Sequence, residues 1–154
     1  MVPATTTRVP QHTAEHVNQR IQEQTEANIA RYAAAGPEAI DQRLKELDRE
    51  WDMERTLEAN ASTLALIGVL LAATLSPWWL LLPGVVTALL LQHAVQGWCP
   101  PVPVFRRLGF RTQTEIDYER YALKALRGDF RDLPTVAQGS DQAAAHELLL
   151  AMQR

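Results

Sequence analysis

Charged side chains are missing from the middle of the chain. The 47 residues from Ala59 to Phe105 contain no Asp, Glu, Lys or Arg, whereas charged residues are frequent on both sides. A helix of a soluble domain presents one face to water and therefore mixes apolar with charged positions. A bilayer core about 30 Å thick needs about 20 helical residues for one crossing. The apolar stretch over residues 61–98 is therefore long enough for two crossings.

Ser76 and Pro77 interrupt this stretch near its middle. Proline disfavours helical backbone at the preceding residue and is favoured in the first turn of a helix, so we expect one span to end at residue 75 and the next to begin at residue 78. Trp78 and Trp79 follow at once, and indole rings favour the lipid headgroup level. The pattern predicts an all-α fold with a transmembrane hairpin over residues 61–99 and long amphipathic cytoplasmic helices before and after it.

Basic residues flank both spans but do not occur in the turn between them. They are Arg43, Lys45, Arg49 and Arg55 before the first span, and Arg106, Arg107 and Arg111 after the second. The positive-inside rule then places both termini in the cytoplasm. Pro100, Pro101 and Pro103 predict an extended exit from the bilayer. The arginines that follow alternate with apolar residues, so we expect Arg106, Arg107 and Arg111 to contact lipid headgroups.

Small residues recur at helical spacing in both spans. Helices in lipid associate through such residues, because lipid chains are as apolar as the side chains. The candidates are Ala65, Gly68 and Ala72 on the first span, and Gly84 and Ala88 on the second. These faces could pack on each other or on a second protomer.

Residues 1–12 have little to bury and are expected to be a disordered tail, and residues 13–60 follow as a helical region. Gly36 and Pro37 should divide that region, because Gly favours helix ends and Pro favours helix starts. No strong helix breaker follows until Ser76, so the second helix is expected to continue into the membrane. Its apolar residues follow coiled-coil spacing: Ile40, Leu44, Leu47 and Trp51. They could pack on the preceding helix or form an oligomer or partner seam.

Residues 100–154 are expected to form an interfacial segment followed by two cytoplasmic helices. Thr112 and Glu115 form a capping-box signature that opens a helix ending at Gly128. A last amphipathic helix should start at Ser140. The eight basic and seven acidic residues from Pro100 onward are too balanced for a surface that binds nucleic acid.

Cys99 is the only cysteine, which excludes an intramolecular disulfide and a paired-cysteine metal or redox motif. On a continuing helix, Gln92, Gln96 and Cys99 would share one face. This face is either a structural feature of the membrane boundary or a thiol site close to basic residues. His12 and His16 lie one turn apart, but two ligands in this order do not make a known metal motif, and no metal is predicted.

Two short motifs resemble the YgaP-like inner-membrane family. They are Gly97-Trp98-Cys99-Pro100 and the Leu108-Gly109 pair that is followed by Thr112, and the resemblance covers residues from about 60 to 112. It implies a two-span fold in a bacterial inner membrane and a tendency to self-associate. That family is sometimes fused to a rhodanese, a sulfurtransferase with a loop cysteine. The only cysteine here ends the second span, so no rhodanese domain is expected in these residues.

The sequence therefore predicts a non-enzymatic membrane anchor or oligomeric scaffold that binds a partner through its cytoplasmic helices. Its expected partners are membrane lipid, further copies of itself and a cytoplasmic protein, without nucleic acid and without a cofactor. Two alternatives stay open. One is sulfur or redox handling at Cys99 together with a separate sulfurtransferase. The other is a small-molecule conduit with Gln92, Gln96 and Cys99 at its mouth.

Overall fold

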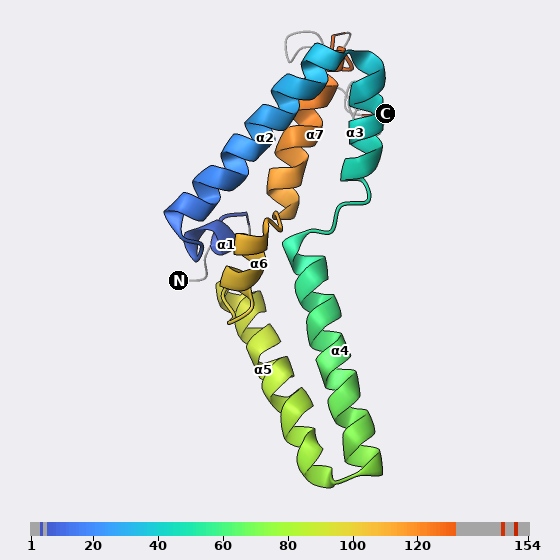
Figure 1. The fold of residues 1–154 in the computed structure, drawn as a ribbon. Coiled ribbons are helices and arrows are strands. Elements are labelled where there is room, and N and C mark those ends of the chain that lie inside the picture. Colours follow the sequence, from blue (N-terminus) through green and yellow to red (C-terminus); the bar gives the residue numbers. More distant parts are fainter. Residues whose placement is uncertain (1–3, 5, 132–145, 147–149, 151–154) are drawn as a thin grey trace. The chain divides into compact units, whose positions relative to one another are not determined.

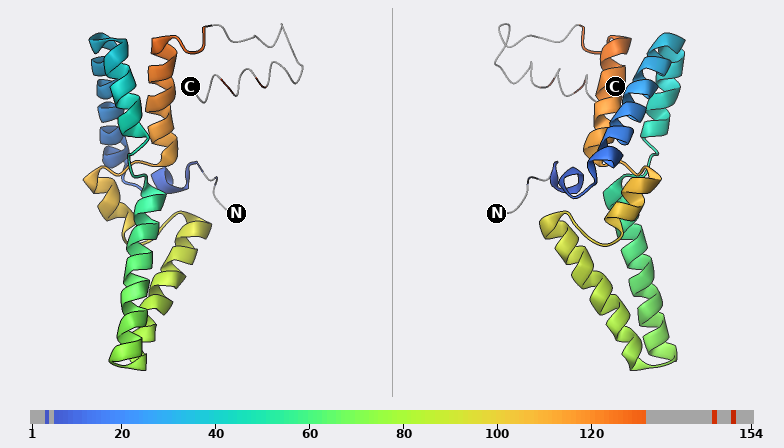
Figure 2. Two further views of the ribbon diagram at one scale, coloured as in Figure 1. Left: turned by 90° about the vertical axis from the view of Figure 1, so that its right-hand side faces the viewer. Right: turned by 60° about the vertical axis from the view of Figure 1, so that its left-hand side comes forward.

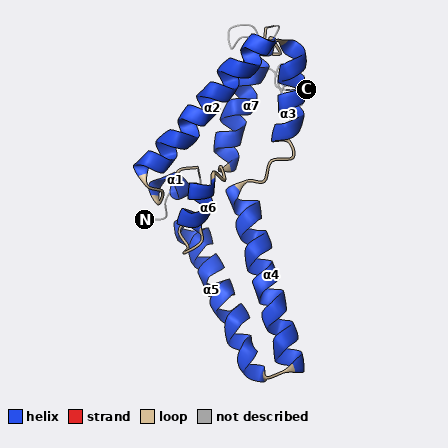
Figure 3. Cartoon of the chain, viewed as in Figure 1, coloured by secondary structure: helices blue, strands red, loops and turns tan. Residues whose placement is uncertain are grey.

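The computed structural model describes residues 4, 6–131, 146 and 150, and over this part of the chain the fold contains helices and no strand (Figures 1 and 3). The expected all-α fold is thus confirmed for these residues. The helices are α1 (Arg8–Gln11), α2 (Glu15–Ala35), α3 (Pro37–Leu47), α4 (Met53–Thr74), the 3-10 helix η1 (Pro77–Leu80), α5 (Leu81–Gln96), α6 (Val102–Leu108) and α7 (Gln113–Arg127). The helix expected to start at Ser140 lies outside the described residues, apart from two isolated positions.

The chain divides into two compact units. The first contains residues 1–24 and 50–116, and the second contains residues 25–49 and 117–154. The first unit carries both apolar helices and the segments that pack at their charged ends. The second carries α3 and most of α7.

In the first unit, α4 and α5 lie side by side, joined by the turn that contains η1 (Figures 1 and 2). Ser76 is extended and Pro77 opens η1, so the expected break at these two residues is confirmed. Segments Met53–Thr74 and Pro77–Gln96 are each long and apolar enough to cross a membrane. Only 17% and 6% of their most apolar windows are buried. A core helix of a soluble protein would be mostly buried, so these two helices are unusually exposed for their apolar composition.

The two helices are in close contact at Gly68. A Cβ atom placed there would lie 2.5 Å from Cδ of Pro83, so only glycine fits without a shift of the chain. Gly84 has open space around it, and Ala88 beside it is exposed. Of the two alternatives for the small residues, packing between the two spans or on a second protomer, Gly68 follows the first. Gly84 and Ala88 point away from this contact, and their packing on a second protomer stays a prediction.

Several helix boundaries differ from the sequence expectations. The helix predicted to run unbroken into the membrane ends at Leu47, and α4 restarts at Met53. Asp52 explains the restart, because its side chain accepts a hydrogen bond of 2.8 Å from the backbone N–H of Arg55, as an N-cap does. The boundary at Gly36 and Pro37 is confirmed, with Gly36 at a φ of 97°.

Two segments predicted to lack regular structure are helical. Pro101 is the N-cap of α6 and Pro103 lies in its first turn, so the expected extended exit is wrong: proline suits a helix start as well as an extended chain. Residues Arg8–Gln11 of the expected disordered tail form α1, where Val9 is buried in the core of the first unit. A single buried valine and one paired arginine anchor a segment that its composition marked as mobile.

In the second unit, ion pairs join α3 to α7. Arg43 on α3 binds the buried carboxylate of Glu119 at 2.7 and 3.2 Å, and Arg127 pairs with Asp41. The seam residues Ile40, Leu44 and Leu47 are buried in the chain, whereas Trp51 belongs to the first unit and is exposed. The first three therefore pack intramolecularly. A seam between copies of the chain is a prediction that this single chain does not test.

Gly68→Ala and Gly84→Ala should change stability in opposite directions. Alanine gains about 1 kcal/mol over glycine in helix propensity, but overpacking at the Pro83 contact costs about 1–3 kcal/mol. We expect Gly68→Ala to lower the melting temperature of the detergent-solubilised protein and Gly84→Ala to leave it equal or higher. Equal shifts for both variants would show that the two helices do not meet at Gly68.

Candidate functional site

Three polar side chains meet where the apolar pair of helices begins and ends. Nε2 of His93, in the last turn of α5, lies 2.9 Å from Oε2 of Glu54, in the first turn of α4. Arg8 on α1 donates to the other oxygen of Glu54 at 2.8 Å and to the backbone carbonyl of Ala94 at 2.8 Å. These contacts tie α1, α4 and α5 together at one point.

The contact with Glu54 fixes the proton on the histidine ring. An ionised carboxylate only accepts hydrogen bonds, so Nε2 of His93 is the nitrogen that carries hydrogen, and in the neutral ring Nδ1 is then an acceptor. His93 is only 2% exposed. Its Nδ1 is buried and has no hydrogen-bond partner in the described part of the chain. A buried, unpaired polar atom costs free energy and therefore calls for a functional explanation.

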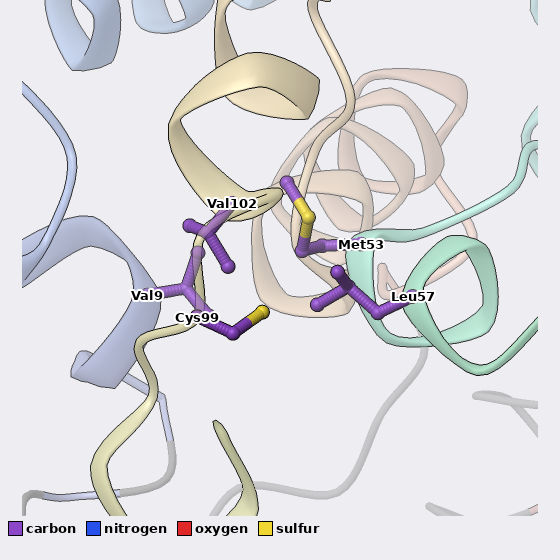
Figure 4. Close-up of a cluster of buried hydrophobic side chains, with 5 residues drawn as sticks. All are labelled: Val9, Met53, Leu57, Cys99 and Val102. Atoms are coloured by element: carbon purple, nitrogen blue, oxygen red, sulfur yellow. The ribbon is translucent and has the colours of Figure 1, made fainter. Parts of the chain in front are cut away.

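The side chain of Cys99 also interacts with this imidazole. It is a free thiol, 4% exposed, and it belongs to the apolar core of the first unit with Val9, Met53, Leu57 and Val102. Figure 4 shows these five side chains converging, with the sulfur of Cys99 directed toward Leu57.

Cys99 also lines an apolar pocket between α4 and α5. The pocket has a volume of about 80 Å³. Its walls are Leu57, Asn60, Ala61, Leu64, Val86, Leu89, Leu90 and Pro101. None of these wall residues carries a charge. The thiol therefore lies between the relay formed by Arg8, Glu54 and His93 and this apolar pocket.

Gly97 places Cys99 beside His93. It ends α5 in the left-handed conformation, at a φ of 77°, and its N–H donates to the carbonyl of His93 at 2.7 Å. A Cβ atom there would lie 2.5 Å from Cβ of Arg8, so glycine is required for both the turn and the packing. Because the helix stops at Gln96, the helical spacing that was expected to continue to Cys99 does not apply.

The predicted face of Gln92, Gln96 and Cys99 is therefore corrected. Gln96 is exposed and Gln92 is half-buried, while His93, which lies outside the predicted face, interacts with the thiol. Sequence reasoning also missed Arg8 and Glu54. One signal was present: a histidine within a charge-free apolar stretch needs a polar partner. The identity of that partner depends on the register of the two helices, which the sequence does not give.

Two arginines expected at lipid headgroups are buried instead. Arg106 is fully buried and binds Glu115 at 2.6 and 2.7 Å, with further hydrogen bonds to Thr13, Asn18 and the carbonyl of Phe110. Arg111 is buried and binds Glu50 at 2.7 and 2.8 Å. Each guanidinium is paired with a carboxylate inside the first unit, so neither arginine needs a lipid headgroup to balance its charge.

The remaining expected lipid contacts are exposed. Arg107, Trp78 and Trp79 all lie on the surface, with Trp78 78% exposed beside the turn between the two apolar helices. This placement is compatible with headgroup contact, which stays a prediction. The capping box is confirmed, since the N–H of Thr112 donates to Glu115 at 2.8 Å and the N–H of Glu115 donates to the Thr112 hydroxyl at 3.3 Å.

No metal centre is evident in the part of the chain that the structure describes, where no three His, Cys, Asp or Glu side chains converge. His12 and His16 are both exposed.

A comparison with protein-family models, curated proteins and solved structures finds no match to this chain.

Replacing Arg106 should destabilise the first unit far more than replacing its neighbour Arg107. Arg106→Met leaves the partly buried Glu115 carboxylate without its partner, and breaking such a pair costs about 3–5 kcal/mol. Arg107→Met removes an exposed charge and should cost less than about 0.5 kcal/mol. Chemical unfolding of the detergent-solubilised variants measures both. Similar losses would mean that Arg106 does not carry a buried ion pair.

Stability should also depend on the protonation of Glu115. Burial raises the pKa of this carboxyl, but hydrogen bonds from Arg106 and the Thr112 N–H outweigh it, so the pKa lies below the usual 4.5. A group with a lowered pKa stabilises the fold above its unfolded pKa and loses that contribution as pH falls through the folded value. The stability difference between wild type and Glu115→Gln should therefore be constant near pH 7 and shrink below about pH 4.5. A difference that grows at low pH contradicts the assigned pairing.

Proposed function

We propose that this chain is a two-span membrane protein that anchors a cytoplasmic helical region and presents it to a protein partner. The observation that supports this most strongly is the large apolar surface that the chain leaves uncovered on α4 and α5. The exposed large side chains are Leu64, Leu66, Ile67, Val69, Leu70 and Leu75 on α4 and its end, and Trp78, Trp79, Leu80, Leu81, Val85, Leu91 and Val95 on η1 and α5.

Water is a poor environment for such a surface. Exposed apolar area costs about 25 cal/mol for each Å², and two helices in contact cover only one face of each other. Helices satisfy their own backbone hydrogen bonds, which is the requirement for crossing lipid. A bilayer can therefore cover these faces without leaving backbone polar groups unpaired. The resemblance to the YgaP-like family implies the same two-span arrangement.

Polar contacts mark the level at which the two spans would leave the hydrocarbon. Glu54, Arg8 and His93 meet at the start of α4 and the end of α5, and the guanidinium of Arg55 lies 4.5 Å from the ring centre of Trp51. Basic residues cluster at this end and not at the turn. By the positive-inside rule, this end faces the cytoplasm of a bacterial inner membrane and the turn faces outward.

The exposed face of α7 suits a protein partner. Tyr118 is 68% exposed and Tyr121, one turn further on, is also exposed, whereas Ile116 and Leu123 are buried on the other side of the helix. Tyrosine is enriched where proteins bind one another, because its ring is apolar and its hydroxyl tolerates water. We therefore place partner binding, or contact with another copy of the chain, on this face.

The topology can be tested by single-cysteine labelling in intact bacteria that express the full chain. In a Cys99→Ser background, Ser76→Cys lies in the turn and Arg107→Cys lies beyond the second span. We expect a membrane-impermeant maleimide to label Ser76→Cys in intact cells and Arg107→Cys only after the membrane is opened. Labelling of both positions from the same side would contradict the two-span arrangement.

Partner binding can be tested by cross-linking in native membranes. Wild type should give one defined cross-linked species with a partner or a second copy. The double variant Tyr118→Ser with Tyr121→Ser should reduce it about tenfold or more, because central aromatic residues dominate interface energies. Gln113→Ser, at an exposed position of the same helix, is the matched control. A chain that stays monomeric, or a species that the double variant leaves unchanged, would remove the proposal for α7.

A further inference from the structure

We propose that Cys99 is a site of S-acylation, at which the thiol takes a fatty acyl group from an acyl thioester and the chain enters the pocket between α4 and α5. This inference rests on the membrane location proposed above and needs no partner protein. Three features of the site carry it: a base beside the thiol, an acid that orients the base, and an apolar space for the product.

The base is Nδ1 of His93. It is buried and unpaired, in a side chain that interacts with Cys99 and is only 2% exposed. Nε2 of the same ring donates its hydrogen to Oε2 of Glu54, 2.9 Å away. Nδ1 is therefore the ring nitrogen left to accept the thiol proton. A nucleophile, a base within reach and a third group that orients the base form the usual arrangement of covalent catalysis.

Arg8 completes the relay on its far side. It binds the second oxygen of Glu54 at 2.8 Å and the carbonyl of Ala94 at 2.8 Å, so the carboxylate is held between α1 and the end of α5. The Glu54 carboxylate stabilises the positive charge that the imidazole gains when it takes the thiol proton. The relay therefore places a base and its counter-charge beside the thiol, at a position from which water is largely excluded.

The surroundings of the sulfur select the electrophile. Cys99 is 4% exposed, and the pocket that it lines has walls such as Leu57, Leu64 and Leu89 and no charged side chain. A charged sulfur donor finds no charged partner on these walls, whose only polar side chain besides Cys99 is that of Asn60. An acyl chain fits them, and cysteines next to membrane helices are frequent acceptors of fatty acyl groups.

There is room for the chain beyond the pocket. A second hollow of about 510 Å³ shares Ala61, Val86 and Leu90 as walls with the first. Ala65 and Thr87 also line it, together with the charged side chains of Arg55 and Glu58. The first carbons of the acyl chain would lie in the pocket beside Cys99, and the rest would continue between α4 and α5 into the hydrocarbon.

The reaction balances without an oxidant or reductant. The proton of the Cys99 thiol passes to Nδ1 of His93, and the sulfur attacks the carbonyl carbon of the acyl donor. The new carbon–sulfur bond replaces the thioester bond of the donor, whose thiolate leaves and takes the proton from the imidazolium. The products are an acyl thioester on Cys99 and a free donor thiol.

Palmitoyl-coenzyme A is a suitable probe for the detergent-solubilised full chain. We expect the mass of wild type to increase by one palmitoyl group, hydroxylamine to reverse this, and Cys99→Ser to show no increase. His93→Gln should slow the modification about 100-fold, because a positioned general base contributes about 10²–10⁴. Absence of the adduct on wild type, or equal rates for wild type and His93→Gln, would overturn the proposal.

A second pair of variants tests the pocket independently of the relay. Leu89→Trp fills the space beside Cys99, whereas Leu91→Trp adds the same side chain at an exposed position of the same helix. We expect Leu89→Trp to reduce acylation about tenfold or more and Leu91→Trp to leave it unchanged. Equal rates in the two variants would refute the pocket as the acyl site. A chain that is labelled as a two-span protein yet takes no adduct would refute this inference alone, whereas failure of the topology test would refute the membrane proposal.

Discussion

The apolar side chains of α4 and α5 need an environment that the described part of the chain does not supply. The two helices contact each other along one face, with Gly68 against Pro83, and direct leucines, valines and tryptophans outward on the others. Burying apolar area is the largest favourable contribution to folding, so a surface of this size left in water would oppose the fold. The proposed covering of the outward faces by lipid would remove this cost, and the positions of the polar groups fit that proposal.

The polar groups of the first unit are concentrated where the apolar helices start and end. Arg106 is fully buried with Glu115, Arg111 pairs with Glu50, and Glu54 pairs with Arg8. Buried ion pairs add little net stability, since desolvation offsets their attraction, but separating one is expensive. Such pairs therefore define which segments pack where the apolar helices start and end, and one of them contacts His93, the base in the chemistry proposed for Cys99. The arginines after the second apolar helix look in the sequence like lipid contacts, but Arg106 and Arg111 are paired with carboxylates inside the first unit.

The sequence predicts those features that depend on neighbouring residues. The charge-free stretch, the break at Ser76 and Pro77, and the capping box at Thr112 are local patterns with a direct physical cause, and the structure contains all three. The restart of α4 at Asp52 was also local, but an aspartate N-cap was not recognised in a stretch rich in charges. Pro101 could open a helix or extend the chain, and only tertiary packing decides between the two.

The candidate site could not be predicted in the same way. Contacts such as His93 with Glu54 join residues 39 positions apart, and they depend on the register of two helices and on the left-handed turn at Gly97. The burial of Arg106 likewise depends on its distant partner Asn18. Sequence periodicity indicated that Cys99 lies at a boundary, but it assigned the wrong neighbours because the helix ends earlier than the spacing assumed.

The covering of α4 and α5 by lipid is tested most directly by extracting membranes that contain the full chain with alkaline carbonate. This treatment removes proteins held by charge or by other proteins and leaves those whose helices lie in the hydrocarbon. The account predicts that the chain stays in the membrane pellet and enters solution only with detergent. Recovery of the chain in the carbonate supernatant would contradict it.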